Sequence, residues 1–181
     1  MNFIKKTLLE FKIKRGLKKD RYLPKAFSYK SLRRVGVIFS IDDLKKHEAI
    51  KSFIKEFEQD GIEVKSLAYK AKDTQNFEFY FDFFEDKDVS IWAQMKSPYM
   101  LSFLDQKFDY LFCLDEDLNL YMQYLLVNAN ASIRIGALQK EDAYKDYFEL
   151  MVKANKQGDM NLLTKEIIHY IRKISGNEQT V

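Results

Sequence analysis

The sequence predicts a three-layer, Rossmann-like α/β sandwich with a mostly parallel sheet, preceded by a basic N-terminal helix. Short apolar runs typical of buried strands alternate with longer segments whose apolar residues recur every three to four positions. Strands separated by helices in this way usually form a parallel sheet that is covered on both faces. The chain has 181 residues and is 46% hydrophobic, which suits one domain with a sizeable core.

The first 34 residues are predicted to form a basic helical arm and a linker. Asn2–Lys19 has one glycine and no proline, which favours a helix that ends near Asp20. Pro24 requires extended backbone before it, and Lys25–Arg34 is expected to lead into the first strand. Residues 1–34 hold twelve basic and two acidic side chains, a net charge of +10, which leaves −7 for the rest of a chain that totals +3.

A βαβ unit opens the predicted domain, which spans residues 35–174. Val35–Phe39 is a continuous apolar run of the kind found in strands buried on both faces. Asp43–Gln59 has the apolar spacing of a helix, and Ser40 or Asp42 is expected to cap it. Ile62–Leu67 alternates as a second strand, and the crossover between the two strands is expected to be right-handed.

The second half of the domain continues the alternation after a less regular stretch. Phe77–Phe84 alternates only in part, and Val89–Trp92 is compatible with a strand or a loop. The elements expected next are a short helix Tyr99–Gln106, a buried strand Tyr110–Leu114, a helix Leu118–Asn130, a strand Ser132–Leu138, an edge strand Tyr147–Val152 and a terminal helix Asn161–Ile174. Residues 175–181 are expected to form a flexible tail.

A candidate ligand pocket follows from the fold class, because open α/β sheets bind ligands outside the carboxyl ends of their strands. The turn after the first predicted strand contains no glycine, so the dinucleotide and P-loop fingerprints are both missing. Three carboxylates at 115–117 follow another strand and suit either a polar ligand or a cap for the next helix. The candidate pocket residues are Ser40, Asp42, Asp115, Asn119 and Arg134. For Arg134, pairing with an acidic neighbour is an alternative role.

The sequence offers few catalytic groups, and no catalytic residue, metal site or cofactor is expected. His47 and His169 both lie within predicted helices, His47 on a solvated face and His169 at the edge of a packed one. Cys113 lies in an apolar strand, where burial would raise its thiol pKa and hide it. A lone cysteine cannot form an internal disulfide, and no run of about 18 apolar residues exists, so a cytoplasmic location is expected.

The density of cations in the arm indicates a polyanionic partner, although packing of the arm against its own acidic domain is an equal alternative. The expected polyanion-binding residues are Lys5, Lys6, Lys12, Lys14, Arg15, Lys18, Lys19 and Arg21. On a helical wheel the arm shows two apolar ridges on nearly opposite sides, Ile4, Leu8 and Phe11 and then Leu9, Ile13 and Leu17. One ridge is free to pack on the domain while the other meets a partner. Opposed ridges do not favour a helix lying flat on a membrane.

The residues Val35–Phe39, Lys107–Phe112 and Ala131–Gly136 carry two resemblances. In their order along the chain they resemble a family of small uncharacterised bacterial proteins of about this length. Lys107–Gly136, with a Phe-Asp strand, a helix and an Arg-Ile-Gly strand, is more weakly similar to the N-terminal half of heptosyltransferase-type glycosyltransferases. That second likeness implies a Rossmann-like topology.

These observations favour a non-enzymatic binding or accessory module whose basic arm contacts RNA, a ribonucleoprotein or another acidic partner. One alternative is a small-molecule or nucleotide-sugar-binding enzyme related to glycosyltransferases. Another is peripheral membrane attachment through the ridge that contains Ile4, Leu8 and Phe11.

Overall fold

The computed structural model describes residues 2–19, 28–41, 43–72, 80–138, 142–153, 156 and 158–174. It contains a six-stranded sheet with the order β3-β2-β1-β4-β5-β6, and every neighbouring pair is parallel. The strands are β1 (Arg34–Ile41), β2 (Glu63–Lys70), β3 (Phe83–Glu85), β4 (Lys107–Cys113), β5 (Asn130–Ala137) and β6 (Leu150–Val152). This arrangement confirms the predicted fold class.

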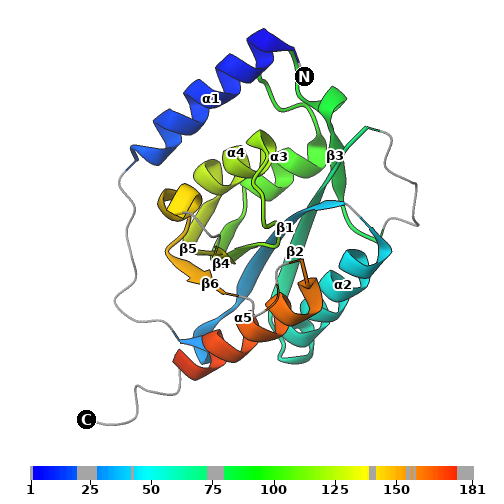
Figure 1. The fold of residues 1–181 in the computed structure, drawn as a ribbon, viewed down its shortest axis with the longest axis vertical. Helices are drawn as coiled ribbons and strands as arrows, with labels where there is room; N and C mark the ends of the chain where they lie inside the picture. Colours follow the sequence, from blue (N-terminus) through cyan, green and yellow to red (C-terminus); the bar gives the residue numbers. More distant parts are fainter. Residues whose placement is uncertain are drawn as a thin grey trace.

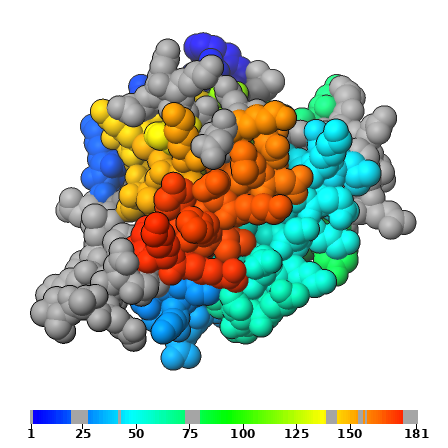
Figure 2. Space-filling model, turned by 60° about the horizontal axis from the view of Figure 1, so that its bottom comes forward, coloured from blue at the N-terminus to red at the C-terminus, as the bar shows by residue number. Residues whose placement is uncertain are grey.

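Helices cover both faces of the sheet (Figure 1). One face is covered by α2 (Leu44–Gln59) and α5 (Met160–Ile174), which lie beside each other in Figure 2. The other face is covered by α3 (Pro98–Leu104) and α4 (Leu120–Asn128), and α1 (Phe3–Leu17) packs against α4. Short 3₁₀ helices occur at Tyr29–Ser31, Asp86–Asp88 and Asp142–Tyr147.

Two apolar cores hold the layers together, one on each face of the sheet. Successive residues of β1 pack into opposite cores, with Val37 facing α2 and α5 and Ile38 facing α3 and α4. Interlocked aromatic rings fill the first core, where Phe53 of α2 meets Phe112 of β4 edge to face at 5.1 Å. Both rings are buried, so the sheet is fixed in the middle of the sandwich.

The order of the strands places a switch in direction between β1 and β4. From β1 the chain moves outward to β2 and β3, and from β4 it moves the opposite way to β5 and β6. The crossovers therefore diverge from the β1–β4 pair and leave a crevice at the carboxyl ends of these two strands.

Several element boundaries differ from the sequence-based expectation. The cap of α2 is Asp43, whose carboxylate accepts from the Lys46 amide, rather than Ser40 or Asp42. The cap of α4 is Asn119 rather than Asp115 or Asp117. The expected edge strand Tyr147–Val152 is reduced to β6, because Tyr147 ends a 3₁₀ helix and residues 148 and 149 are not in a strand. Val89–Trp92 is a loop with one isolated bridge between Val89 and Met95.

Helix α1 packs against the rest of the domain, which is one of the two alternatives that the sequence left open for the arm. Leu9 and Ile13 of the second ridge are buried, with exposed fractions of 0% and 3%. Gly16 is also buried and lies against Val127 of α4, where an added Cβ would come within 2.6 Å of Val127 Cγ2 and 2.8 Å of Val127 Cβ. The two helices approach closely because this position has no side chain.

We predict that Gly16→Ala destabilises the protein although alanine is the better helix former. The helix gains about 0.5–1 kcal/mol from the substitution, but forcing a methyl group into Val127 costs about 1–3 kcal/mol. Chemical denaturation should show a net loss of about 1 kcal/mol. Val127→Ala in the same chain removes the Cγ2 contact but keeps Val127 Cβ at 2.8 Å, so the alanine at position 16 should destabilise less there. An equal loss in both backgrounds would contradict the packing argument.

Candidate functional site

A polar cleft of about 780 Å³ opens at the carboxyl edge of the sheet, at the switch between β1 and β4. Its walls come from the ends of β1 and β2, the segment that follows β4, and the N-terminal ends of α2 and α5. Three of the predicted pocket residues, Ser40, Asp115 and Asn119, lie together in this cleft. The fourth, Asp42, lies outside the described residues.

Asp115 is the centre of a hydrogen-bond network at the base of the cleft. Its side chain is buried, and its two oxygens accept from the Ser40 amide at 2.9 and 3.0 Å. The Ser40 hydroxyl donates to Oδ2 of Asp115 at 2.6 Å, and the Lys46 ammonium group lies 2.7 Å from Oδ1. A buried carboxylate needs this many donors, because each lost hydration contact has to be replaced.

Asn119 joins the network to the start of α4. Its amide oxygen accepts from the Tyr121 and Met122 backbone amides at 2.9 and 3.1 Å, which caps the helix. Its amide nitrogen donates to the Ser40 hydroxyl at 2.9 Å. The hydroxyl of Ser40 therefore accepts from Asn119 and donates to Asp115, and its orientation is fixed.

Three helices begin at the cleft, and each is capped by the side chain of the residue that precedes it. Asp43 caps α2, Asn119 caps α4, and the Asp159 carboxylate accepts from the Leu162 amide in the first turn of α5. Uncapped amides and the positive end of the helix dipole make a helix N-terminus attractive to phosphate. Here two of the caps are carboxylates, so the cleft is poorly suited to a phosphate group.

The other charged groups of the cleft are mixed in sign. Glu116 accepts from the Gly158 amide at 2.6 Å and so links the segment after β4 to the segment before α5. Asp117, Lys45 and Lys156 also line the cleft, and none has a side-chain partner within the part of the chain that the structure describes. The described lining has five carboxylates against three ammonium groups.

Arg134 does not line the cleft, and its place in the predicted pocket is wrong. Its guanidinium group is buried beneath the C-terminal end of α4, where it donates to the carbonyls of Leu126 and Ala129. It also lies 3.4 Å from Glu149, the ion pair that the sequence offered as its alternative role. Arg134 thus satisfies carbonyl groups that the end of a helix leaves free.

The side chains that the sequence weighed for catalysis lie away from the cleft lining. Cys113 is fully buried, and burial together with the charge of Asp115 raises its thiol pKa. His47 was expected to be solvated but is buried beside the Phe81 ring at 4.9 Å. His169 is exposed and borders a groove between α2 and α5. Among the described residues, no cluster of His, Cys, Asp or Glu is arranged to hold a metal ion.

The cations of the arm divide into two sets. Lys5 and Lys12 turn toward the domain, and Lys12 donates to the Ala93 carbonyl at 2.5 Å. The exposed set consists of Lys6, Lys14, Arg15, Lys18 and Lys19. Arg21 lies outside the described residues. The polyanion-binding residues predicted from the sequence therefore do not all face solvent.

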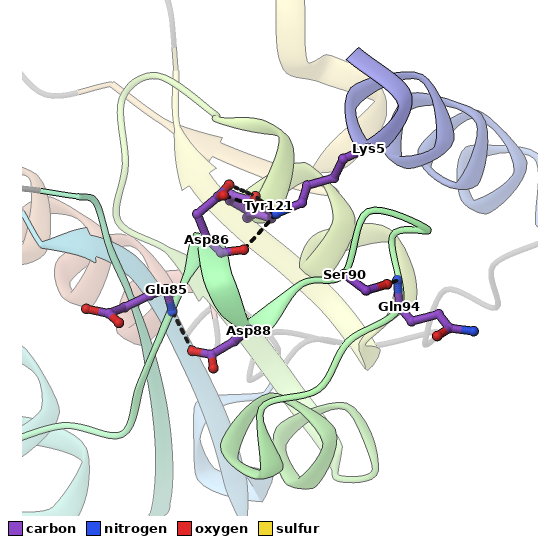
Figure 3. Close-up of polar contacts among 7 residues, drawn as sticks. All are labelled: Lys5, Glu85, Asp86, Asp88, Ser90, Gln94 and Tyr121. Atoms are coloured by element: carbon purple, nitrogen blue, oxygen red, sulfur yellow. Dashed lines mark hydrogen bonds and ion pairs between the residues drawn. The ribbon is translucent and has the colours of Figure 1, made fainter. Parts of the chain in front are cut away.

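Lys5 is a buried clamp between α1 and the 3₁₀ helix at Asp86–Asp88 (Figure 3). Its ammonium group donates to the Asp86 carbonyl at 2.7 Å and to the Asp86 carboxylate at 3.1 Å. Tyr121 of α4 donates to the other oxygen of the same carboxylate. Burial raises the pKa of Asp86, but the hydrogen bonds from Tyr121 and Lys5 outweigh it and hold that pKa below the ordinary 3.8. The separation of 81 positions between Lys5 and Asp86 hid this pair from sequence analysis.

The parallel sheet, its covering helices and the cleft at the switch point define a Rossmann-like α/β domain. The chain belongs to a family described as "Family of unknown function (DUF6913)", whose model matches residues 5–174. The resemblance to an uncharacterised family is thus confirmed.

Among solved structures, E. coli heptosyltransferase WaaC with ADP is similar, with a TM-score of 0.50 and 12% identity. The similarity covers 82% of this chain and 49% of that chain, so this chain corresponds to about half of the heptosyltransferase. No curated protein matches this chain. In the described residues, no helix has the length and apolar character to cross a membrane.

We predict that Asp115→Asn lowers the free energy of unfolding by about 3 kcal/mol, because it removes the buried carboxylate charge that pairs with the largely buried Lys46 ammonium group. Asp117→Asn, in the exposed part of the same segment, is the matched control and should change stability by no more than about 0.5 kcal/mol. Combining Asp115→Asn with Lys46→Met should restore part of the loss in chemical denaturation. Full additivity of the two substitutions would show that the pair is not coupled.

We predict that the attachment of α1 weakens in acid. A carboxylate whose pKa is lowered in the folded state contributes stability above its unfolded pKa, and that contribution is lost as the pH falls through the folded pKa. For Asp86 the loss therefore begins near pH 3.8 and is complete below its folded pKa. Hydrogen exchange of the α1 amides should speed up over this range in the wild-type protein.

Asp86→Asn should make the α1 amides exchange faster than in the wild type at neutral pH. In acid, where the wild type has lost the same carboxylate charge, the two proteins should exchange at nearly the same rate. Asp105→Asn, at an exposed carboxylate after α3, is the control and should keep the wild-type profile. Wild-type α1 amides that stay equally protected from neutral pH to well below the Asp86 pKa would count against the clamp.

Proposed function

We propose that this chain is a non-enzymatic binding module that holds a small, uncharged, hydroxyl-rich ligand in the cleft at the switch point. The observation that carries the proposal is the fixed network of Ser40, Asp115, Lys46 and Asn119 at the base of that cleft. A network whose members are already oriented presents a rigid polar floor to a ligand, which lowers the entropy cost of binding. The cleft volume of about 780 Å³ is in the range of small-molecule sites.

The charge distribution supports a neutral ligand over a nucleotide. Two of the three helix N-termini at the cleft carry carboxylate caps, which repel phosphate. Hydroxyl groups both donate and accept, so they match a lining in which Asp117 offers oxygen acceptors and Lys45 and Lys156 offer ammonium donors. The ring of Tyr69 adds an apolar wall suited to the C–H face of a sugar ring.

The same network supports binding over chemistry. Both oxygens of Asp115 already accept hydrogen bonds, and the Lys46 charge opposes its use as a base. The Ser40 hydroxyl donates to an ion-paired carboxylate instead of to a free base, so it is not activated as a nucleophile. The proposal assumes a reducing cytoplasm, in which the buried Cys113 stays a thiol.

Transferase activity is the alternative within this proposal. The heptosyltransferase similarity has 12% identity and concerns the fold, and its 49% coverage of the larger chain leaves half of that protein without a counterpart here. A sugar ligand without turnover supports the binding module, whereas transfer of a sugar from a nucleotide donor supports the alternative.

A contact with an acidic partner is the second part of the proposal. Lys6, Lys14 and Arg15 of α1, and Lys18 and Lys19 directly after it, stay exposed when the helix is packed. We propose that these cations meet a polyanion such as RNA or a ribonucleoprotein, or another anionic surface.

We predict that a panel of monosaccharides and polyols contains members that raise the melting temperature, whereas nucleoside phosphates do not. Ser40→Ala should weaken binding of such a sugar at least tenfold, because the hydroxyl that orients the cleft floor is removed. Ser52→Ala, in the groove between α2 and α5, is the matched control and should bind as wild type does. Binding restricted to phosphorylated compounds, or equal losses in both variants, would overturn the ligand assignment.

A further inference from the structure

The outer face of α1 presents apolar side chains to solvent. Phe3, Phe11 and Ile4 are 81%, 64% and 47% exposed. Ile4 and Phe11 lie on the side of the helix opposite Leu9 and Ile13, which are buried against the domain, and Phe3 is the first residue of the helix, beside that outer side. Packing therefore buries one of the two ridges and leaves Ile4 and Phe11 of the other exposed, whereas Leu8 of that ridge is partly buried against the domain.

A second exposed apolar group lies beside the N-terminal end of α1. Trp92 and Ile91 are 61% and 51% exposed at the tip of the loop between Val89 and Met95. A hollow of about 480 Å³ is lined both by these two residues and by Asn2 and Lys5, which places the loop next to the start of the helix. The two apolar groups are thus neighbours on one end of the molecule.

The helix and the loop are joined at two points, so they form one surface. The Lys5 ammonium group is bound to Asp86, just before the loop (Figure 3). The Lys12 ammonium group is bound to the carbonyl of Ala93, a buried residue with a φ of 53° next to Trp92. A positive φ in a non-glycine residue persists only when surrounding contacts hold it. The bond from Lys12 is such a contact, and it fixes the loop that displays Trp92.

The surface around these apolar groups is basic. Residues 2–19 present five exposed cations, three in α1 and two directly after it, and one acidic residue, Glu10, whose carboxylate lies 3.9 Å from the Lys6 ammonium group. Lys96, after the loop, is exposed, and its ammonium group has no partner among the described residues. Apolar and indole side chains ringed by cations are the composition of an interfacial membrane site, since they enter the headgroup region while the cations stay at anionic lipids.

We propose that the outer face of α1 and the Trp92 loop together dock this protein on an anionic lipid bilayer. This inference rests on the second part of the proposed function, because it names the acidic partner of the α1 cations. The exposed aliphatic side chains Ile4 and Ile91 favour a bilayer over RNA: hydrocarbon side chains gain from the acyl boundary, whereas RNA recognition relies on aromatic stacking and phosphate contacts. Phe3, Phe11 and Trp92 enter the headgroup region, and Lys14, Arg15 and Lys18 meet the lipid phosphates.

The test uses the full chain and vesicles of phosphatidylcholine, with or without about 30% phosphatidylserine, in a flotation assay. Binding to the anionic vesicles should be at least tenfold stronger than to the neutral ones and should fall as salt rises. Trp92 is the single tryptophan of the chain, so its emission reports directly on this loop. The emission should shift to shorter wavelength with anionic vesicles and be quenched by brominated lipid.

Two variants at exposed positions test the two parts of the surface without disturbing the core. Phe3→Ser with Phe11→Ser should abolish the emission shift, and Lys14→Glu with Lys18→Glu should reduce vesicle binding at least tenfold. The matched controls lie on the opposite face of the sheet, Leu44→Ser with Tyr170→Ser and Lys55→Glu with Lys165→Glu. These controls should bind as wild type does; equal losses in controls and test variants would overturn the inference.

Binding of a fluorescent single-stranded RNA, measured by anisotropy at the same salt, distinguishes the lipid proposal from the broader proposal of an acidic partner. RNA binding without vesicle binding would overturn the lipid assignment and leave the acidic-partner proposal standing. Absence of binding to both probes would overturn both. Vesicle binding with an unchanged Trp92 emission would contradict insertion of the loop and thus the assignment of the Trp92 loop to the lipid-binding surface.

Discussion

The buried carboxylate of Asp115 holds together the part of the structure on which the cleft depends. It follows β4, and its partners come from the end of β1 and from α2. Through Ser40 it also reaches Asn119 and the start of α4. Four elements that diverge at the switch point are therefore tied to one ionised group. The cleft exists because the sheet order opens it, and it keeps its shape because this group cannot be left without partners.

The packing of α1 depends on a second ion pair. Lys5 is buried, its partner Asp86 is nearly half exposed, and the lack of a side chain at Gly16 lets the helix approach Val127. An ion pair of this kind adds little stability, but it fixes which groups meet. Here it fixes the rotation of α1 about its own axis. That rotation decides which apolar ridge is buried and which faces solvent.

Much of the fold was predictable because its signals are local. The apolar runs that became β1 and β4 and the periodic stripe of α2 each define an element without reference to the rest of the chain. A cleft lies at the strand ends, where the sequence predicts a ligand pocket, since that rule follows from topology alone. Its chemistry was less accessible. Asp115, Asp117 and Asn119 are all good capping residues, and only the positions of Ser40 and Lys46 decide that the amide caps α4.

The missed contacts have a common physical cause, which is that they join residues of different elements of the fold. Arg134 meets the end of α4 rather than the cleft because a long side chain reaches past its own strand. The prediction that His47 is solvated was wrong because Phe81, from another segment, covers the imidazole ring. Phe81, like Asp86, carries no local signal of its role. Sequence patterns report which face of an element is buried and say little about what covers it.

The division of charge along the chain acquires a different meaning in the folded protein. An arm of +10 beside a body of −7 could neutralise the body, yet within residues 2–19 and their described surroundings only Lys5 forms an ion pair with the body, through Asp86. Lys12 binds a neutral carbonyl. The attachment of α1 rests mainly on Leu9, Ile13 and the close approach at Gly16, so apolar packing holds the helix in place. Its remaining cations are thus kept at the surface, where an anionic partner can reach them.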